Sequence, residues 1–223
     1  MPPTEASDVE ARGRPVRMAV GEAVLEGNLT LPVGARGVVL FAHGSGSSRF
    51  SPRNRAVAGV LNQVGLGTLL IDLLTPQEEE RDQWTRHHRF DIGLLAGRLV
   101  GAMEWLAQAA DTRDLRVGLF GASTGAAAAL IAAARQPGIV GAVVSRGGRP
   151  DLAGDALPHV QAPTLLIVGG ADTPVIALNQ TALAQLRSEK RLTIIPGATH
   201  LFEEPGALEE VARLARDWFL RYL

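Results

Sequence analysis

The sequence contains no cysteine and a single lysine, Lys190, and these two gaps exclude several kinds of chemistry. Without cysteine there is no disulfide framework, no thiolate metal site, no iron–sulfur cluster and no cysteine nucleophile. With one lysine, neither Schiff-base catalysis nor a phosphate-binding P-loop is expected. An excess of charge is missing too, since 22 basic residues face 23 acidic ones. We therefore expect no nucleic-acid partner.

Long apolar runs and targeting signals are also missing from the sequence. No stretch approaches the roughly 20 apolar residues needed to cross a bilayer. The first ten residues include acidic side chains where a secretory signal needs positive charge followed by an apolar run. We expect no membrane partner and, by default, a cytoplasmic location.

What is present is the composition of an ordinary globular protein. The 223 residues are 46% hydrophobic and 20% charged, which suits a single domain with a sizeable core. Residues 1–15 are polar and contain proline and glycine, so they predict a flexible N-terminal tail. Residues 16–223 are expected to form one domain.

Strand-like and helix-like segments alternate along this domain. Residues 16–20 and 23–31 alternate in polarity around Gly21 and predict an antiparallel pair. Short continuous apolar runs, typical of strands buried on both faces, then occur at residues 37–42, 68–74, 115–120, 139–144, 164–168 and 192–195. Helical patterns fall between them at 52–64, 91–110, 124–136, 177–189 and 206–222. The order predicts an α/β fold with a mostly parallel central sheet and helices on both faces.

Ligands of such sheets bind beyond the carboxyl ends of the strands, so the residues that follow each strand come first for function. Gly121-Ala-Ser-Thr-Gly125 lies between an apolar strand and a small-residue helix. This is the pattern of a nucleophile elbow, in which small neighbours allow a sharp turn that exposes the serine. Ser123 is therefore the candidate nucleophile.

A serine nucleophile needs a base, and the base needs an acid that orients it. His200 follows the last predicted strand and can reach the turn that carries Ser123. For the acid, Asp172 on the Gly169-Gly170 turn is favoured, because glycine lets a carboxylate sit close to the sheet edge. Asp151, one strand earlier, is the alternative.

Two backbone N–H groups are expected to stabilise the oxyanion of the reaction. One belongs to Thr124, directly after the nucleophile, and the other to the glycine-rich turn His43-Gly-Ser-Gly46. Ser45 is the first choice in that turn and Gly46 the second. Gly46 is also a candidate substrate contact, and His43 is expected to shape the turn through hydrogen bonds of its ring.

With these motifs the chain resembles a serine α/β-hydrolase of the dienelactone-hydrolase-like group, over about residues 16–223. The resemblance also draws on the glycine-rich run 43–48 and on Ser51-Pro-Arg-Asn-Arg55. It implies an α/β-hydrolase fold and hydrolysis of carboxylic esters by a Ser123, Asp172 and His200 triad. One departure is clear, because dienelactone hydrolases proper use a cysteine nucleophile and this chain has none.

The surroundings of the site suggest a small and accessible substrate. The segment between residues 144 and 162 is too short for a helical lid, so no large cap domain is expected. The polar stretch 75–90 is the predicted partial roof, with Trp84 as a substrate contact.

Arginines gather at the same edge: Arg49, Arg53, Arg55, Arg146 and Arg149. Either they clamp an anionic substrate or they pair with acids such as Asp72 and Asp151, and internal pairing is the favoured reading of the group. Arg146 is kept as a candidate substrate contact.

The sequence thus predicts a carboxylesterase-type hydrolase that cleaves small esters through a Ser123 acyl-enzyme, without a metal or other cofactor. Two alternatives stay open. The same triad could pass the acyl group to peroxide or to an alcohol, or the fold could be a catalytically silent binding protein.

Overall fold

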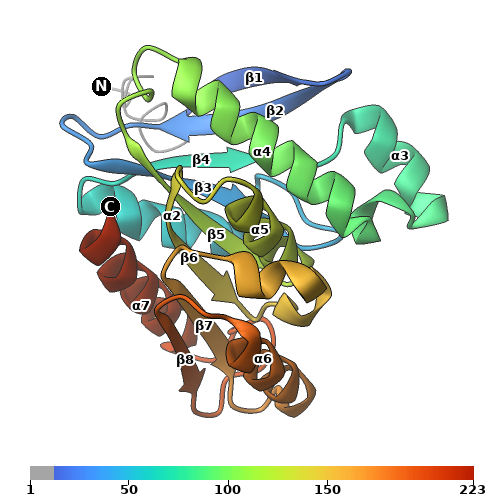
Figure 1. The fold of residues 1–223 in the computed structure, drawn as a ribbon, viewed down its shortest axis with the longest axis vertical. Coiled ribbons are helices and arrows are strands. Elements are labelled where there is room, and N and C mark those ends of the chain that lie inside the picture. Colours follow the sequence, from blue (N-terminus) through green and yellow to red (C-terminus); the bar gives the residue numbers. More distant parts are fainter. Residues whose placement is uncertain (1–12) are drawn as a thin grey trace, which may run out of the picture.

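The computed structural model describes residues 13–223, which form an eight-stranded sheet covered by helices on both faces (Figure 1). The strand order is β1-β2-β4-β3-β5-β6-β7-β8, and all pairs from β4 to β8 are parallel. The strands are β1 (Arg14–Val20), β2 (Ala23–Thr30), β3 (Gly37–Ala42), β4 (Gly67–Ile71), β5 (Arg116–Ala122), β6 (Val140–Arg146), β7 (Thr164–Gly169) and β8 (Lys190–Ile195). The predicted α/β class and the mostly parallel sheet are confirmed.

The antiparallel start of the sheet is present but begins earlier than predicted. β1 and β2 pair from Arg14 opposite Leu29 onward, and β2 then pairs antiparallel with β4. Residues 14 and 15 therefore belong to the sheet, and the predicted tail of residues 1–15 is too long; residues 1–12 lie outside the described part. Pro15 is accommodated because β1 is an edge strand, where a missing N–H costs no ladder bond on the open side.

Two helical layers bury the two faces of the parallel strands. On one face α2 (Pro52–Gln63) and α7 (Ala207–Tyr222) pack against each other and cover Val39, Phe41 and Phe120. On the other face α4 (Ile92–Gln108), α5 (Thr124–Arg135) and α6 (Thr173–Gln185) cover neighbouring strand residues such as Leu40 and Leu119. Consecutive residues of a strand point to opposite helical layers, so the residues facing each layer must be apolar. This explains the continuous apolar runs.

The stretch 75–90, predicted as a loop, is largely helical. It forms α3 (Pro76–Thr85) and a short 3₁₀ helix (His88–Phe90), and α3 projects beyond the sheet in Figure 1. α3 has no apolar stripe, so periodicity gave no signal. Its first turn is fixed instead by a capping box, in which the Thr75 side chain accepts from the Glu78 N–H and the Glu78 carboxylate accepts from the Thr75 N–H.

α6 also begins at Thr173, four residues before the predicted start at 177. Pro174 occupies its first turn, a position where proline is tolerated because its missing N–H has no helical partner. As a result Asp172 lies directly at the beginning of this helix.

Candidate active site

Ser123 occupies a strained turn between β5 and α5. Its backbone angles are φ 50° and ψ −122°, a region that L-residues rarely adopt and that is typical of functional sites. A side chain on either flanking glycine would clash: a Cβ on Gly121 would lie 2.4 Å from the Cα of Ala126, and one on Gly125 2.4 Å from the carbonyl oxygen of Ala42. The elbow therefore needs both glycines, as its sequence pattern indicated.

Asp172 and His200 lie together on the turns that follow β7 and β8. The Nδ1 of His200 is 2.7 Å from the Oδ2 of Asp172, a hydrogen bond that places the proton on Nδ1 and leaves Nε2 as an acceptor. The two turns are joined by the Ala171 N–H, which donates to the carbonyl of Ala198 at 2.9 Å. Gly169 permits this approach, since a Cβ there would lie 2.3 Å from the same carbonyl oxygen.

Asp151, the alternative acid, is engaged elsewhere. Its two carboxylate oxygens accept from Nε and Nη2 of Arg149 at 2.9 and 2.8 Å. Of the two candidates, the structure places Asp172 against His200.

Two further glycines bring neighbouring strand ends close to these groups, and sequence reasoning did not single them out. A Cβ on Gly44 would lie 3.0 Å from the Cβ of Ser123, and one on Gly147 would lie 3.0 Å from the carbonyl oxygen of His200. The available signal was a glycine one or two residues after the end of a parallel strand. Ser123, Asp172 and His200 thus share one edge of the sheet: the Ser123 turn lies between the turns that carry Gly44 and Gly147, and Asp172 and His200 follow on the next two strands.

The two backbone N–H groups predicted to bind the oxyanion differ in whether they already have a hydrogen-bond partner. Thr124 is the first residue of α5, where a backbone N–H has no helical partner. The Ser45 N–H, in contrast, donates to the Oγ1 of Thr124 at 3.0 Å. It is therefore occupied rather than free, which a linear sequence gave no means to anticipate. Gly46 adopts φ 72°, so the turn depends on glycine there.

His43 fixes the base of this turn, as expected. Its Nδ1 lies 2.9 Å from the carbonyl oxygen of Gly44, and its Nε2 accepts from the Leu73 N–H at 3.1 Å. The ring is buried, and burial lowers its pKa below 6.5, although the Gly44 carbonyl and the carboxylates of Asp72 and Glu79 oppose the shift. His43 is thus a neutral structural ring.

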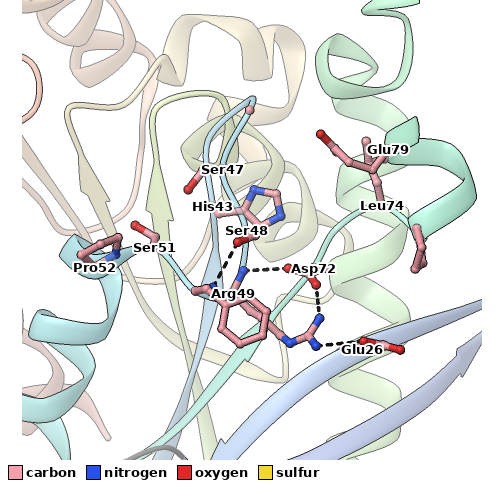
Figure 2. Close-up of a pocket in the computed structure, with 13 residues that line it drawn as sticks. Glu26, His43, Ser47, Ser48, Arg49, Ser51, Pro52, Asp72, Leu74 and Glu79 are labelled. Atoms are coloured by element: carbon pink, nitrogen blue, oxygen red, sulfur yellow. Dashed lines mark hydrogen bonds and ion pairs between the residues drawn. The ribbon is translucent and has the colours of Figure 1, made fainter. Parts of the chain in front are cut away.

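A cavity of about 540 Å³ opens beside the glycine-rich turn (Figure 2). Its wall runs from Gly46 to Pro52 on one side and includes Asp72, Leu74 and Glu79 on the other. In Figure 2 Arg49 lies between Asp72 and Glu26 and binds both carboxylates. Ser123 and His200 do not line this cavity, whereas Gly46 does.

Trp84 and Arg146 are placed very differently from each other. Trp84 is 88% exposed on α3, and it does not line the cavity beside the glycine-rich turn. Arg146 ends β6 and is only 8% exposed. Its carbonyl oxygen accepts the Ser123 N–H at 3.3 Å, so it adjoins the elbow directly.

Within residues 13–223 no group of three or more His, Asp or Glu side chains is arranged to hold a metal ion. In the same part of the chain, every helix is too short or too polar to cross a membrane.

The model of the dienelactone hydrolase family matches residues 26–222. The chain belongs to this family. A dienelactone hydrolase from Anabaena variabilis has a superimposable crystal structure, with 68% identity, a TM-score of 0.93 and coverage of 94% of this chain and 97% of that one. An α/β serine hydrolase without lid from Xanthomonas campestris covers 94% of both chains with a TM-score of 0.72 at 21% identity.

These similarities confirm the predicted family resemblance and the α/β-hydrolase fold without a large cap domain over the described residues. A Mycobacterium tuberculosis protein named "Putative phosphoribosyl transferase Rv0571c" is 58% identical over 218 residues, which are 98% of this chain but 48% of that protein. The chain therefore spans about half the length of this relative.

Proposed function

We propose that this family member is a serine hydrolase that cleaves small carboxylic esters through a Ser123 acyl-enzyme. The observation that carries the proposal is the 2.7 Å hydrogen bond between Asp172 and His200 beside the strained Ser123 turn. An oriented imidazole near a half-buried serine on an elbow is the arrangement that acyl transfer requires.

The expected reaction proceeds in two halves. In the first, His200 Nε2 takes the proton of Ser123 Oγ while the oxygen attacks the ester carbonyl carbon, and the protonated ring then gives that proton to the departing alcohol. In the second half, water attacks the acyl-enzyme with His200 again as base, and the acid and free Ser123 are released. Asp172 keeps the ring in the productive tautomer throughout.

The developing oxyanion is stabilised by the Thr124 N–H and by one N–H of the glycine-rich turn. Ser45 can serve only if its N–H leaves the Thr124 hydroxyl for the substrate oxygen. That exchange is favourable in the transition state, because a charged oxygen is a stronger acceptor than a neutral hydroxyl. Gly46 is the alternative donor.

The absence of a helical lid over the described site favours short and accessible esters. A ten-residue 3₁₀ segment, Pro150–His159, kinked at Gly154, is the one helical element between β6 and β7. The name of the mycobacterial relative does not redirect the proposal, because the family match of this chain is to hydrolases and covers residues 26–222. Transfer of the acyl group to peroxide or an alcohol would use the same residues.

The test is labelling of the purified protein by a fluorophosphonate, together with hydrolysis of p-nitrophenyl esters from acetate to palmitate. The wild type should label and should favour the short esters. Ser123→Ala should abolish labelling and lower kcat by about 10⁴- to 10⁶-fold, because the members of a triad act as a unit. Ser188→Ala, on the turn between α6 and β8, is the control and should behave as wild type.

A wild-type protein that neither labels nor hydrolyses any ester would favour the silent binding protein instead. Labelling that survives Ser123→Ala would place the nucleophile elsewhere.

A further inference from the structure

The cavity beside the glycine-rich turn holds none of the three proposed catalytic side chains, and most of its wall is polar. Its volume of about 540 Å³ lies within the range of small-molecule sites, roughly 300–1,000 Å³. Three carboxylates and three hydroxyls line it: Glu26, Asp72, Glu79, Ser47, Ser48 and Ser51. The hydrogen bonds that these groups still lack decide which ligand the cavity can hold.

Two of the carboxylates keep free acceptor oxygens. Asp72 is satisfied, because Arg49 donates to it from both the backbone N–H and the guanidinium. Glu26 uses only Oε2, which lies 2.8 Å from Arg49 Nη2, and its Oε1 has no hydrogen bond to another described residue. Glu79 Oε1 lies 3.7 Å from Arg89 Nη2, too far for a hydrogen bond. The two arginines thus offset charge at this wall without using up its acceptors.

The serine hydroxyls leave donors on the opposite side of the cavity (Figure 2). Ser48 Oγ accepts from the Phe50 N–H at 3.2 Å, and Ser51 Oγ accepts from the Asn54 N–H at 3.4 Å. Neither hydroxyl, nor that of Ser47, donates to another described residue. Ser51 is only 7% exposed, and a buried donor without an acceptor is costly. A ligand in the cavity can supply the missing acceptor.

Phe50 adds an apolar surface to this polar wall. Its side chain is 55% exposed, and the guanidinium carbon of Arg49 lies 4.4 Å from the centroid of its ring. The face of an aromatic ring carries partial negative charge and therefore attracts weakly positive C–H groups. A ligand that combines hydroxyl groups with C–H surface would match both parts of the wall.

The cavity adjoins the reacting centre through the glycine-rich turn. Gly46 lines the cavity and is a candidate oxyanion donor. Two residues earlier, Gly44 lies against the nucleophile, since a Cβ on it would be 3.0 Å from the Cβ of Ser123. An ester carbonyl held between Ser123 and this turn can therefore extend one of its two substituents into the cavity.

We propose that the cavity binds an uncharged, polyhydroxylated part of the ester, a sugar or another polyol, on its alcohol or its acyl side. The inference rests on the proposed hydrolase function and names its substrate class. Hydroxyl groups both donate and accept, so one polyol serves the free carboxylate oxygens and the serine hydroxyls alike. An ammonium group only donates and a carboxylate only accepts, so each would leave one set unsatisfied. The C–H groups of the polyol pack on Phe50.

The first test measures binding without chemistry, in the full chain carrying Ser123→Ala. An NMR titration with methyl β-D-glucopyranoside should shift the amide signals of residues 46–52. Glu79→Ala, added to this background, should weaken binding about 10-fold, and Ser47→Ala about 3-fold, since hydrogen bonds to a charged and to a neutral group are lost. Glu80→Ala, an exposed change on the same helix outside the cavity wall, is the matched control and should bind as its parent does.

Tetramethylammonium and acetate are titrated in the same way as charged probes. Tighter binding of either one at these residues would overturn the assignment to a polyol.

The second test compares esters that differ only in their hydroxyl groups. Glucose 6-acetate against cyclohexylmethyl acetate tests the alcohol side, and methyl gluconate against methyl hexanoate tests the acyl side. The wild type should prefer the hydroxylated member of at least one pair by about 10-fold or more in kcat/KM, and that pair identifies the side. Glu79→Ala should remove most of this preference, whereas Glu80→Ala should keep it.

The absence of glucoside binding, or binding that survives both Glu79→Ala and Ser47→Ala, would overturn the polyol site. Binding without a preference in either ester pair would overturn its role as a substrate subsite. Binding that depends on Glu79, in a protein that neither labels with fluorophosphonate nor hydrolyses any ester, would instead count against the hydrolase proposal alone.

Discussion

The two sides of the carboxyl edge of the sheet differ in whether their most buried arginines are paired with carboxylates. On the side of β2, β4 and α3, buried and half-buried arginines have matching carboxylates: Arg49 with Asp72, Arg89 with Asp82, and Arg98 with Glu78. On the side of β5 to β8, Ser123 is strained and Arg146 keeps free donors. The first side is built for stability. The second carries backbone strain and unpaired buried donors, both of which cost stability.

The largest predicted effect is on turnover, and it tests Asp172 as the acid that orients His200 on the side of β5 to β8. Asp172→Asn should keep the fold yet lower kcat by up to about 10⁴-fold, because an amide favours the wrong tautomer of His200. Asp151→Asn is the matched control, since its carboxylate binds Arg149 and not the imidazole. Steady-state kinetics on a short p-nitrophenyl ester, with circular dichroism for the fold, checks both.

The reverse pattern, in which Asp151→Asn is crippled and Asp172→Asn remains active, would show that the acid belongs to the preceding strand. The hydrogen bond of Asp172 would then be structural.

An intermediate effect is expected on the side of β2, β4 and α3, where losing an ion pair should lower the free energy of unfolding rather than turnover. Asp82 is fully buried and accepts from the N–H groups of His88 and Arg89 and from the Arg89 guanidinium. Burial alone would raise its pKa, but these hydrogen bonds lower it overall. Asp82→Asn should lower the free energy of unfolding by about 3 kcal/mol, because Arg89 loses its main partner.

Urea denaturation measures that loss, and hydrogen exchange should show it concentrated in α3 and the 3₁₀ helix that follows. Glu80→Gln, an exposed change on the same helix, is the control and should be neutral within about 0.5 kcal/mol. An unchanged stability of Asp82→Asn would mean that this side is not held by its ion pairs.

The smallest effect is the pH dependence that His43 contributes. Its pKa is lowered in the folded state, so the unfolded chain binds a proton more readily as the pH falls. The resulting contribution of His43 to the stability of the fold is complete above pH 6.5. It is lost as the pH falls below that value toward the lowered folded-state pKa. Thermal melts of the wild type and of His43→Gln between pH 5 and 8 should therefore converge toward the acid end. Parallel curves would show that the ring is not held neutral.

Most of the fold could be read from the chain because the parallel strands are buried on both faces. Residues 37–42 were predicted as a strand and form one with those bounds. The exceptions are segments whose order comes from polar contacts. α3 is held by its capping box and by Asp82, and neither contributes to an apolar period. The β6 strand also continues past its apolar run through Ser145 and Arg146, polar residues that are buried at the end of the strand.

The sequence by itself determined the sheet, the family and the order of Ser123, Asp172 and His200 on glycine-bearing turns, since these depend on local geometry and on alternation along the strands. Tertiary structure alone decided which aspartate meets the imidazole, that the Ser45 N–H binds Thr124, and which arginines have partners. The first two are contacts between residues 28 and 79 positions apart, where a displacement of an ångström makes or removes a hydrogen bond. Residue type and spacing do not specify distance at that scale.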